Sequence, residues 1–174
     1  MRRTILSVPL ARQGVELLEV KNRGGKENAQ KEAVTRAKGD ILVFSDVATM
    51  IDTDGLKKIA ANFADPSVGC VSSEDKLLDR DGKPSGEGFY VRYEMWLRRL
   101  ESSVNSLVGL SGSFFAARKE VCRDFAGDVQ SDFRTLLNSV KQGLRGVADP
   151  QSVGYYLDLT CLLYTSDAAD EEDS

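Results

Sequence analysis

Residues 24–46 read GGKENAQKEAVTRAKGDILVFSD, and this stretch decides the fold. Alanines recur every four residues within 27–38 and Gly39 follows, which predicts a helix that ends at the glycine. The continuous apolar run at 41–44 is typical of a central strand covered on both faces, as in parallel sheets. A helix that leads directly into such a strand predicts an α/β fold.

The same alternation of strands and helices extends on both sides of this stretch. We expect further strands near 15–20, 68–72, 114–117, 145–148 and 152–155, and further helices near 54–63, 91–105 and 133–140. The helix at 91–105 carries an apolar stripe that predicts a core face, formed by Tyr93, Trp96, Leu97, Leu100 and Val104. The whole pattern predicts a mostly parallel sheet flanked by helices.

The composition excludes several classes of active site and partner. The chain has 174 residues and a formal net charge of −4, so a basic surface for nucleic acid is not expected. It contains no histidine, which excludes Ser-His-Asp and Cys-His catalysis and histidine-ligated zinc. The three cysteines form no CxxC pair, and Cys70 and Cys122 lie among apolar neighbours, as small core residues do.

Neither end of the chain predicts a membrane or export segment. No apolar run approaches the roughly 20 residues that span a bilayer, and the basic start is not followed by the apolar core of a secretion signal. We therefore expect a cytoplasmic location. Residues 157–174 end in an acidic run with little periodicity, so we expect a disordered or non-native tail there.

Three residues could carry chemistry. Asp46 follows the strand at 41–44, and a carboxylate beyond the carboxyl end of a strand can hold a divalent cation or serve as a turn or helix cap. Lys26 follows paired glycines that let the backbone approach a phosphate, or it is an exposed lysine beside a surface turn. Asp132 precedes the helix at 133–140, as a helix cap or as a general base.

Three separated blocks of sequence carry a family resemblance. The first, at 24–73, joins Gly-Gly-Lys, an alanine-rich helix, Gly-Asp, an apolar strand ending in Asp46, and Asp-Pro-Ser-Val-Gly. The second is EGFYVRYEMWLRRLESSVNSLVGLSGSFFAARKEV at 87–121, and the third is SDFRTLLNSVKQGLRGVADPQSV at 131–153. In this order the blocks resemble the donor-binding, acceptor-side and catalytic-aspartate segments of inverting family 2 glycosyltransferases, which have the GT-A fold.

The resemblance implies roles for particular residues. Asp132 matches the catalytic base, and Asp46 matches the first acid of an Asp-x-Asp motif, which would bind Mg²⁺ or Mn²⁺. The residues that would bind the donor are Gly25, Lys26, Asp46, Gly112 and Ser113. The second acidic position of Asp-x-Asp is Ala48 here, which lowers the metal affinity that we expect.

The resemblance also implies a function and a domain plan. We expect residues 1–156 to be a truncated GT-A catalytic domain, impaired as a fragment, whose parent reaches the inner face of the cell membrane only through parts absent from this chain. The implied reaction transfers a sugar, with inversion, from a nucleotide-sugar donor, expected to be a UDP-sugar, to a saccharide or lipid-linked acceptor in polysaccharide biosynthesis. The alternatives are a non-catalytic binding or scaffold fragment and a nucleotidyltransferase. The place of Gly-Gly-Lys after a strand argues against the nucleotidyltransferase.

Overall fold

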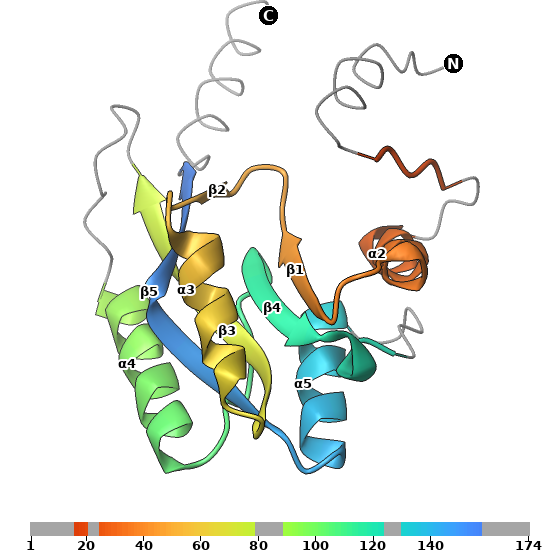
Figure 1. Cartoon of the computed structure of the whole chain (residues 1–174). Helices are drawn as coiled ribbons and strands as arrows, with labels where there is room; N and C mark the ends of the chain where they lie inside the picture. The colour runs from red at the N-terminus through yellow and green to blue at the C-terminus, as the bar shows by residue number, and fades with distance from the viewer. Residues whose placement is uncertain (1–15, 21–24, 79–88, 124–129, 158–174) are drawn as a thin grey trace, which may run out of the picture.

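The computed structural model describes residues 16–20, 25–78, 89–123 and 130–157 (Figure 1). Its helices are α2 (Gly25–Arg36), α3 (Gly55–Ala61), α4 (Phe89–Val104) and α5 (Ser131–Lys141), with short 3₁₀ turns η1 (Asn62–Ala64) and η2 (Lys119–Val121). Its strands are β1 (Ile41–Ser45), β2 (Met50–Ile51), β3 (Val68–Leu78), β4 (Phe114–Arg118) and β5 (Arg145–Leu157). Most of the expected tail, from residue 158 onward, lies outside the described residues.

The strands form one five-stranded sheet in the order β1-β4-β3-β5-β2. β3 and β5 pair in parallel, whereas β4 is antiparallel to both of its neighbours, β1 and β3, and β2 is antiparallel to β5. β1, β3 and β5 therefore run in one direction, with β4 reversed between β1 and β3. The predicted α/β class is confirmed, but the sheet is mixed, because the strand expected at 114–117 enters it in the opposite direction.

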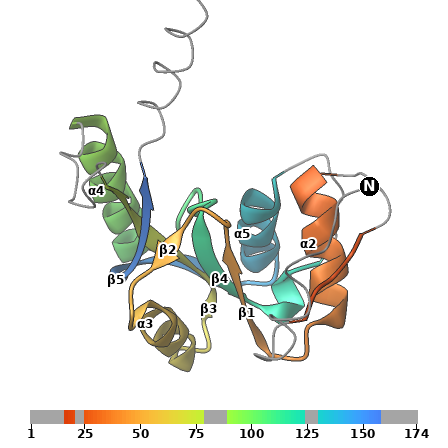
Figure 2. The same cartoon turned by 90° about the horizontal axis from the view of Figure 1, so that it is seen from above.

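Helices cover both faces of this sheet (Figure 2). On one face, Ile59 of α3 packs with Val71, Phe114 and Ala116. On the other face, Leu136 of α5 joins a cluster formed by Cys70, Leu107, Leu110, Phe115, Ala117, Val121 and Cys122. Neighbouring side chains of β4 alternate between these two clusters, as the pleat of a strand requires. The expected buried positions of Cys70 and Cys122 are confirmed, and both thiols are free.

Two strand predictions were wrong in detail. Residues 16–20 form no strand in the structure. The segments expected at 145–148 and 152–155 belong to one long strand, β5, in which the Asp149-Pro150 pair causes a shift of register rather than a turn. Irregular pairing allows a strand to pass through such a point, whereas the sequence pattern shows only a break in the apolar run.

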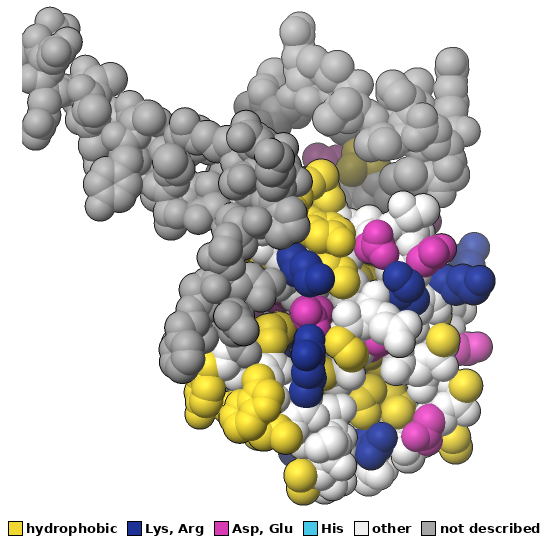
Figure 3. All heavy atoms as spheres, turned by 90° about the vertical axis from the view of Figure 1, so that its left-hand side faces the viewer, with side chains coloured by type: hydrophobic (Ala, Val, Ile, Leu, Met, Phe, Trp, Pro, Cys, Tyr) yellow, Lys and Arg dark blue, Asp and Glu magenta, His cyan; other side chains and the backbone are white. Residues whose placement is uncertain are grey.

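The predicted core face of α4 was also wrong. Its five apolar side chains are exposed by 38 to 84% of their surface. The helix instead turns a polar face to the sheet: the Ala148 N–H donates to Ser102 Oγ at 3.1 Å, and Arg99 Nη2 lies 2.6 Å from Glu74 Oε2. Helical spacing shows that side chains share a face but not which face meets the sheet. Figure 3 shows hydrophobic side chains gathered on the side of the molecule that carries α4.

Within the residues described, none of the helices combines the length and the apolar character needed to cross a bilayer.

Candidate functional site

The candidate site forms where β1 ends and β4 begins. Because the two strands are antiparallel and Ser45 pairs with Phe114, Asp46 lies beside the residues that precede β4. The Asp46 N–H donates to the Ser113 carbonyl at 2.9 Å. The sheet itself therefore brings together two segments, at 46 and at 112–113, that lie far apart in the sequence.

Lys26 reaches this junction from the first turn of α2. Its ammonium lies 2.6 Å from Asp46 Oδ1 and donates to the Gly112 carbonyl at 3.1 Å. Gly25 begins the helix with a φ of +75°, a conformation that suits glycine because it has no Cβ. The Lys26 and Asp46 side chains are 45% and 44% exposed, and such a pair contributes only about 0–1 kcal/mol to stability. An anionic ligand or a cation can therefore displace one partner at little cost.

Asp132 approaches the junction from the first turn of α5. Gln130 occupies the N-cap position of this helix without a side-chain capping bond, so Asp132 is not the cap residue, although its Oδ1 accepts from the Phe133 N–H at 2.8 Å. Its Oδ2 lies only 3.1 Å from the point that a Cβ on Gly112 would occupy. Glycine at 112 therefore allows the Asp132 carboxylate to lie against the backbone of the segment that Lys26 binds.

The structure thus assembles all the site residues that the sequence singled out. Lys26, Asp46, Gly112 and Asp132 meet at one edge of the sheet, with Ser113 beside Asp46 and Gly25 at the start of α2. These residues are not buried as a core cluster would be, since the side chains of Lys26, Asp46 and Asp132 all retain contact with solvent.

A metal at this site would depend on few protein ligands. The described residues hold no group of three or more cysteine, aspartate or glutamate side chains placed to bind one ion. Asp46 alone suits a cation such as Mg²⁺, which commonly takes one or two carboxylates and completes its shell with phosphate oxygens and water. The Lys26 ammonium beside Asp46 shows that this carboxylate accepts a positive charge at contact distance.

Sequence reasoning missed a third carboxylate, which lies beside the site. Asp75, in the carboxyl half of β3, accepts hydrogen bonds from Ser111 Oγ at 2.8 and 2.6 Å and from Ser113 Oγ at 2.7 Å. Its neighbour Ser73 donates to the Phe114 carbonyl at 2.6 Å. The serines at 111 and 113, one on each side of Gly112, were a visible signal of polar contacts, but nothing in the pattern pointed to β3 as their partner.

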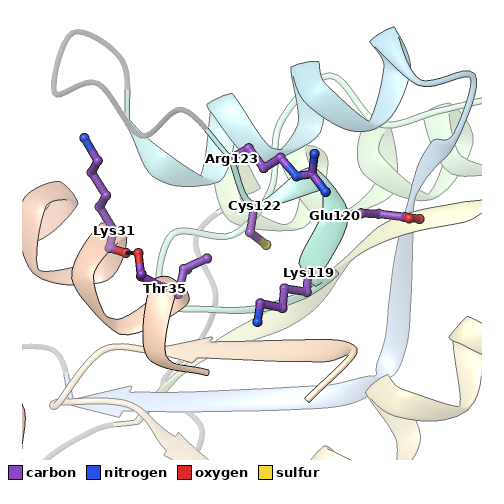
Figure 4. Close-up of a pocket in the computed structure, with 7 residues that line it drawn as sticks. Lys31, Thr35, Lys119, Glu120, Cys122 and Arg123 are labelled. Atoms are coloured by element: carbon purple, nitrogen blue, oxygen red, sulfur yellow. Dashed lines mark hydrogen bonds between the residues drawn. The ribbon is translucent and has the colours of Figure 1, made fainter. Parts of the chain in front are cut away.

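A separate hollow lies between α2 and η2 (Figure 4). Its volume is about 530 Å³, and none of the predicted site residues lines it; the lining residues are Lys31, Val34, Thr35, Lys119, Glu120, Cys122 and Arg123. Lys119 is engaged there, since its ammonium donates to the Ala37 carbonyl at 2.6 Å. Burial raises the pKa of the Cys122 thiol to about 12, so this cysteine is protonated and unreactive. Neither Lys119 nor Cys122 is therefore available as a reactive group in this hollow.

Two known proteins that are similar to this chain are glycosyltransferases. An N-acetylglucosaminyltransferase of Azorhizobium caulinodans is 32% identical over 80 residues, which are 46% of this chain and 20% of that protein. A mannosyltransferase from Pyrobaculum calidifontis, solved with GDP-Man and Mn²⁺, superposes with a TM-score of 0.63 at 27% identity, over 80% of this chain and 38% of that chain. No protein-family model matches the sequence.

A more distant structure shares the fold alone. GalNAc-T7, solved with UDP, GalNAc and Mn²⁺, superposes with a TM-score of 0.62 at 15% identity, over 90% of this chain and 35% of that chain. The described residues therefore have the α/β fold of GT-A glycosyltransferases, as the sequence predicted. The chain spans a fifth of the length of the curated relative and less than two fifths of these two solved chains.

Proposed function

We propose that this protein is a glycosyltransferase that transfers a sugar from a nucleotide-sugar donor to an acceptor hydroxyl. The observation that carries the proposal is the convergence of Lys26, Asp46 and Asp132 around the backbone of Gly112. The similarity to sugar-transferring enzymes of the same fold supports the class of reaction. The finer parts of the proposal are inversion at the anomeric carbon, a UDP-sugar donor and a saccharide or lipid-linked acceptor.

Lys26 and Asp46 form the donor half of the site. The Lys26 ammonium would bind the diphosphate and stabilise the negative charge that grows on it as the sugar departs. Asp46 would hold Mg²⁺ or Mn²⁺, which supplies further positive charge to the leaving phosphate when bound. The exposed Lys26–Asp46 pair suits this use, because each group can exchange its present partner for a charge on the ligand. Gly25 and Gly112 keep the surrounding backbone free of side chains.

Asp132 forms the acceptor half. Its carboxylate would take the proton from the acceptor hydroxyl while that oxygen forms a bond to the anomeric carbon. In the same step the bond from that carbon to the phosphate oxygen breaks, and the nucleoside diphosphate leaves. A single displacement inverts the configuration, so no nucleophilic residue of the protein takes part. The absence of histidine is therefore compatible with the reaction.

A non-catalytic role in binding is the second candidate. The observation that favours it is Ala48, which stands where the motif has its second acid. A protein that only binds would retain affinity for nucleotide and show no sugar transfer. The two candidates therefore make the same prediction for binding and opposite predictions for turnover.

Calorimetric titration tests the donor half. We expect UDP, or GDP if the donor is GDP-linked, to bind with Mn²⁺ and to lose affinity when EDTA is added. Asp46→Asn should remove the metal dependence, and Lys26→Met should weaken binding by about tenfold or more, since a charge-assisted contact is lost. The control is the Lys58–Asp52 pair, at 3.1 Å with side chains about one third exposed. Lys58→Met and Asp52→Asn should leave binding unchanged.

Turnover separates the candidates. Release of nucleoside diphosphate from UDP-sugars and GDP-mannose, abolished by Asp132→Asn with binding intact, would support catalysis. A folded sample that binds neither UDP nor GDP would contradict both functions for this chain.

A further inference from the structure

The Asp75 carboxylate lies within a set of serine hydroxyls that borders the candidate site. Ser111 Oγ lies 2.8 and 2.6 Å from its two oxygens, Ser113 Oγ lies 2.7 Å from Oδ1, and Ser73 Oγ lies 3.3 Å from Oδ1. The pairing of Ser72 with Phe115 explains the contact, because it sets the carboxyl half of β3 beside the residues that precede β4. A carboxylate can only accept, so a serine forms a hydrogen bond with it only by donating its own hydrogen.

Counting hydrogens fixes the direction of these bonds. A hydroxyl has one hydrogen, and that of Ser73 goes to the Phe114 carbonyl at 2.6 Å, its shorter contact. The hydrogen of Ser113 goes to Asp75 Oδ1 at 2.7 Å, a charged acceptor that is closer than Ser111 Oγ at 2.9 Å. With its hydrogen engaged by Asp75, Ser113 Oγ has only a lone pair to offer outward.

Ser113 also belongs to the candidate site. Its carbonyl accepts from the Asp46 N–H, and the preceding residue, Gly112, accepts from Lys26. Its side chain is partly exposed. A ligand held by Lys26 and Asp46 would therefore lie beside an oxygen that can accept a hydrogen bond but not donate one.

We propose that Asp75 is a positioning residue that makes Ser113 a hydrogen-bond acceptor for a hydroxyl group of the donor sugar. Asp75 does not touch the ligand; it holds the hydrogen of Ser113 and so sets the polarity of that side chain. The ligand class follows from the polarity, since a sugar hydroxyl can donate to Ser113 whereas a phosphate oxygen cannot. This inference rests on the proposed function, because it requires a sugar beside Lys26 and Asp46.

A purely structural role makes a different prediction. If the cluster only holds β3 against the segment at 111–113, loss of Asp75 would disturb Gly112 and weaken every ligand that meets Lys26. If Asp75 acts through the Ser113 hydroxyl, its loss would weaken only ligands that carry the sugar. Comparing a nucleotide-sugar with its own nucleoside diphosphate separates the two roles.

The experiment measures affinity for nucleoside diphosphate and for the matching nucleotide-sugar, both with Mn²⁺, in Asp75→Asn, Ser113→Ala and the double variant. We expect each single change to lower nucleotide-sugar affinity about tenfold and to leave diphosphate affinity unchanged. The double variant should lose no more than Ser113→Ala alone, because both changes remove one interaction. Ser73→Ala is the control, since its hydrogen goes to Phe114, and it should affect neither ligand.

Three results would overturn the inference. These are an equal loss of both ligands in Asp75→Asn, additive losses in the double variant, and full nucleotide-sugar affinity in Ser113→Ala. The last result needs no change at Asp75 and so holds even if Asp75→Asn does not fold. If the wild-type protein binds the diphosphate and these variants bind the nucleotide-sugar normally, the inference about Asp75 and Ser113 is overturned while the proposed function stands. Wild-type protein that binds neither ligand would overturn the proposed function and this inference with it.

Discussion

Replacing Gly112 by alanine tests whether the close approach of Asp132 matters for catalysis. A Cβ at this position would lie 3.1 Å from Asp132 Oδ2, so the carboxylate must move by a few tenths of an ångström. A displacement of about 1 Å costs roughly 100-fold in rate, so a shift of a few tenths of an ångström costs a smaller factor. We therefore expect Gly112→Ala to lower kcat about tenfold. Nucleoside diphosphate affinity should not change, because Lys26 binds the Gly112 carbonyl, which alanine retains.

The assay is release of nucleoside diphosphate under saturating donor and acceptor, with calorimetric affinity measured on the same samples. Gly109→Ala is the matched control, because a Cβ there meets nothing within 4 Å. It provides the same gain of a methyl group in the same connecting segment without any contact. Wild-type kcat in Gly112→Ala would refute the view that Asp132 acts from its observed position. A parallel loss of kcat and of diphosphate affinity would show instead that the methyl group distorts the whole segment.

Two further predictions concern stability. Gly69→Ala should destabilise the protein by about 1–3 kcal/mol in urea unfolding relative to Gly109→Ala, since its Cβ would lie 2.7 to 2.9 Å from atoms of Ser139 and Leu144 near their backbones. Equal unfolding midpoints for the two variants would contradict the packing of β3 on α5. Burial raises the pKa of Cys70 to about 11 and that of Cys122 to about 12, from an ordinary thiol value of 9.0, so above pH 9 the folded state retains protons that the unfolded state loses. The contribution of the two protonated thiols to the free energy of unfolding is therefore fully present below about pH 9 and is lost as the pH rises toward these values. In urea unfolding at several pH values, the double variant Cys70→Ala/Cys122→Ala should show a smaller decline over this range.

The sequence predicted the four helices and the strands at 41–44, 68–72 and 114–117, and it named residues that the structure brings together at the candidate site. The helix at 27–38 and the strand at 41–44 follow from local pattern, and the resemblance of three collinear blocks implied that Asp46 and Gly112 belong to one donor site. Each of these features depends on residues that lie close in sequence or in a segment that itself carries a signal. Local pattern could not predict strand direction: Phe114–Ala117 is apolar throughout and buried on both faces, so it fits a central strand of either direction equally well.

The contacts of α4 and of Asp75 could not be predicted from local pattern either. An apolar stripe predicts burial only if the helix turns it to the sheet, and α4 turns Ser102 toward β5 instead. Asp75 is one acid among several in a polar segment, and its partners at 111 and 113 lie more than 30 residues away. Only the pairing of β3 with β4 brings these groups together.

The reversed strand explains why the site exists at this edge of the sheet. β1 and β3 run in the same direction, so Asp46 and the carboxyl half of β3 lie toward the same edge. A parallel strand between them would place its preceding segment at the opposite edge, away from both. Because β4 is antiparallel, the segment at 111–113 enters between the two carboxyl ends, where Lys26 and Asp46 meet one side of it and Asp75 meets the other. Ser113 thus contacts Asp46 through its carbonyl and Asp75 through its hydroxyl, and a change of strand direction would break both contacts at once.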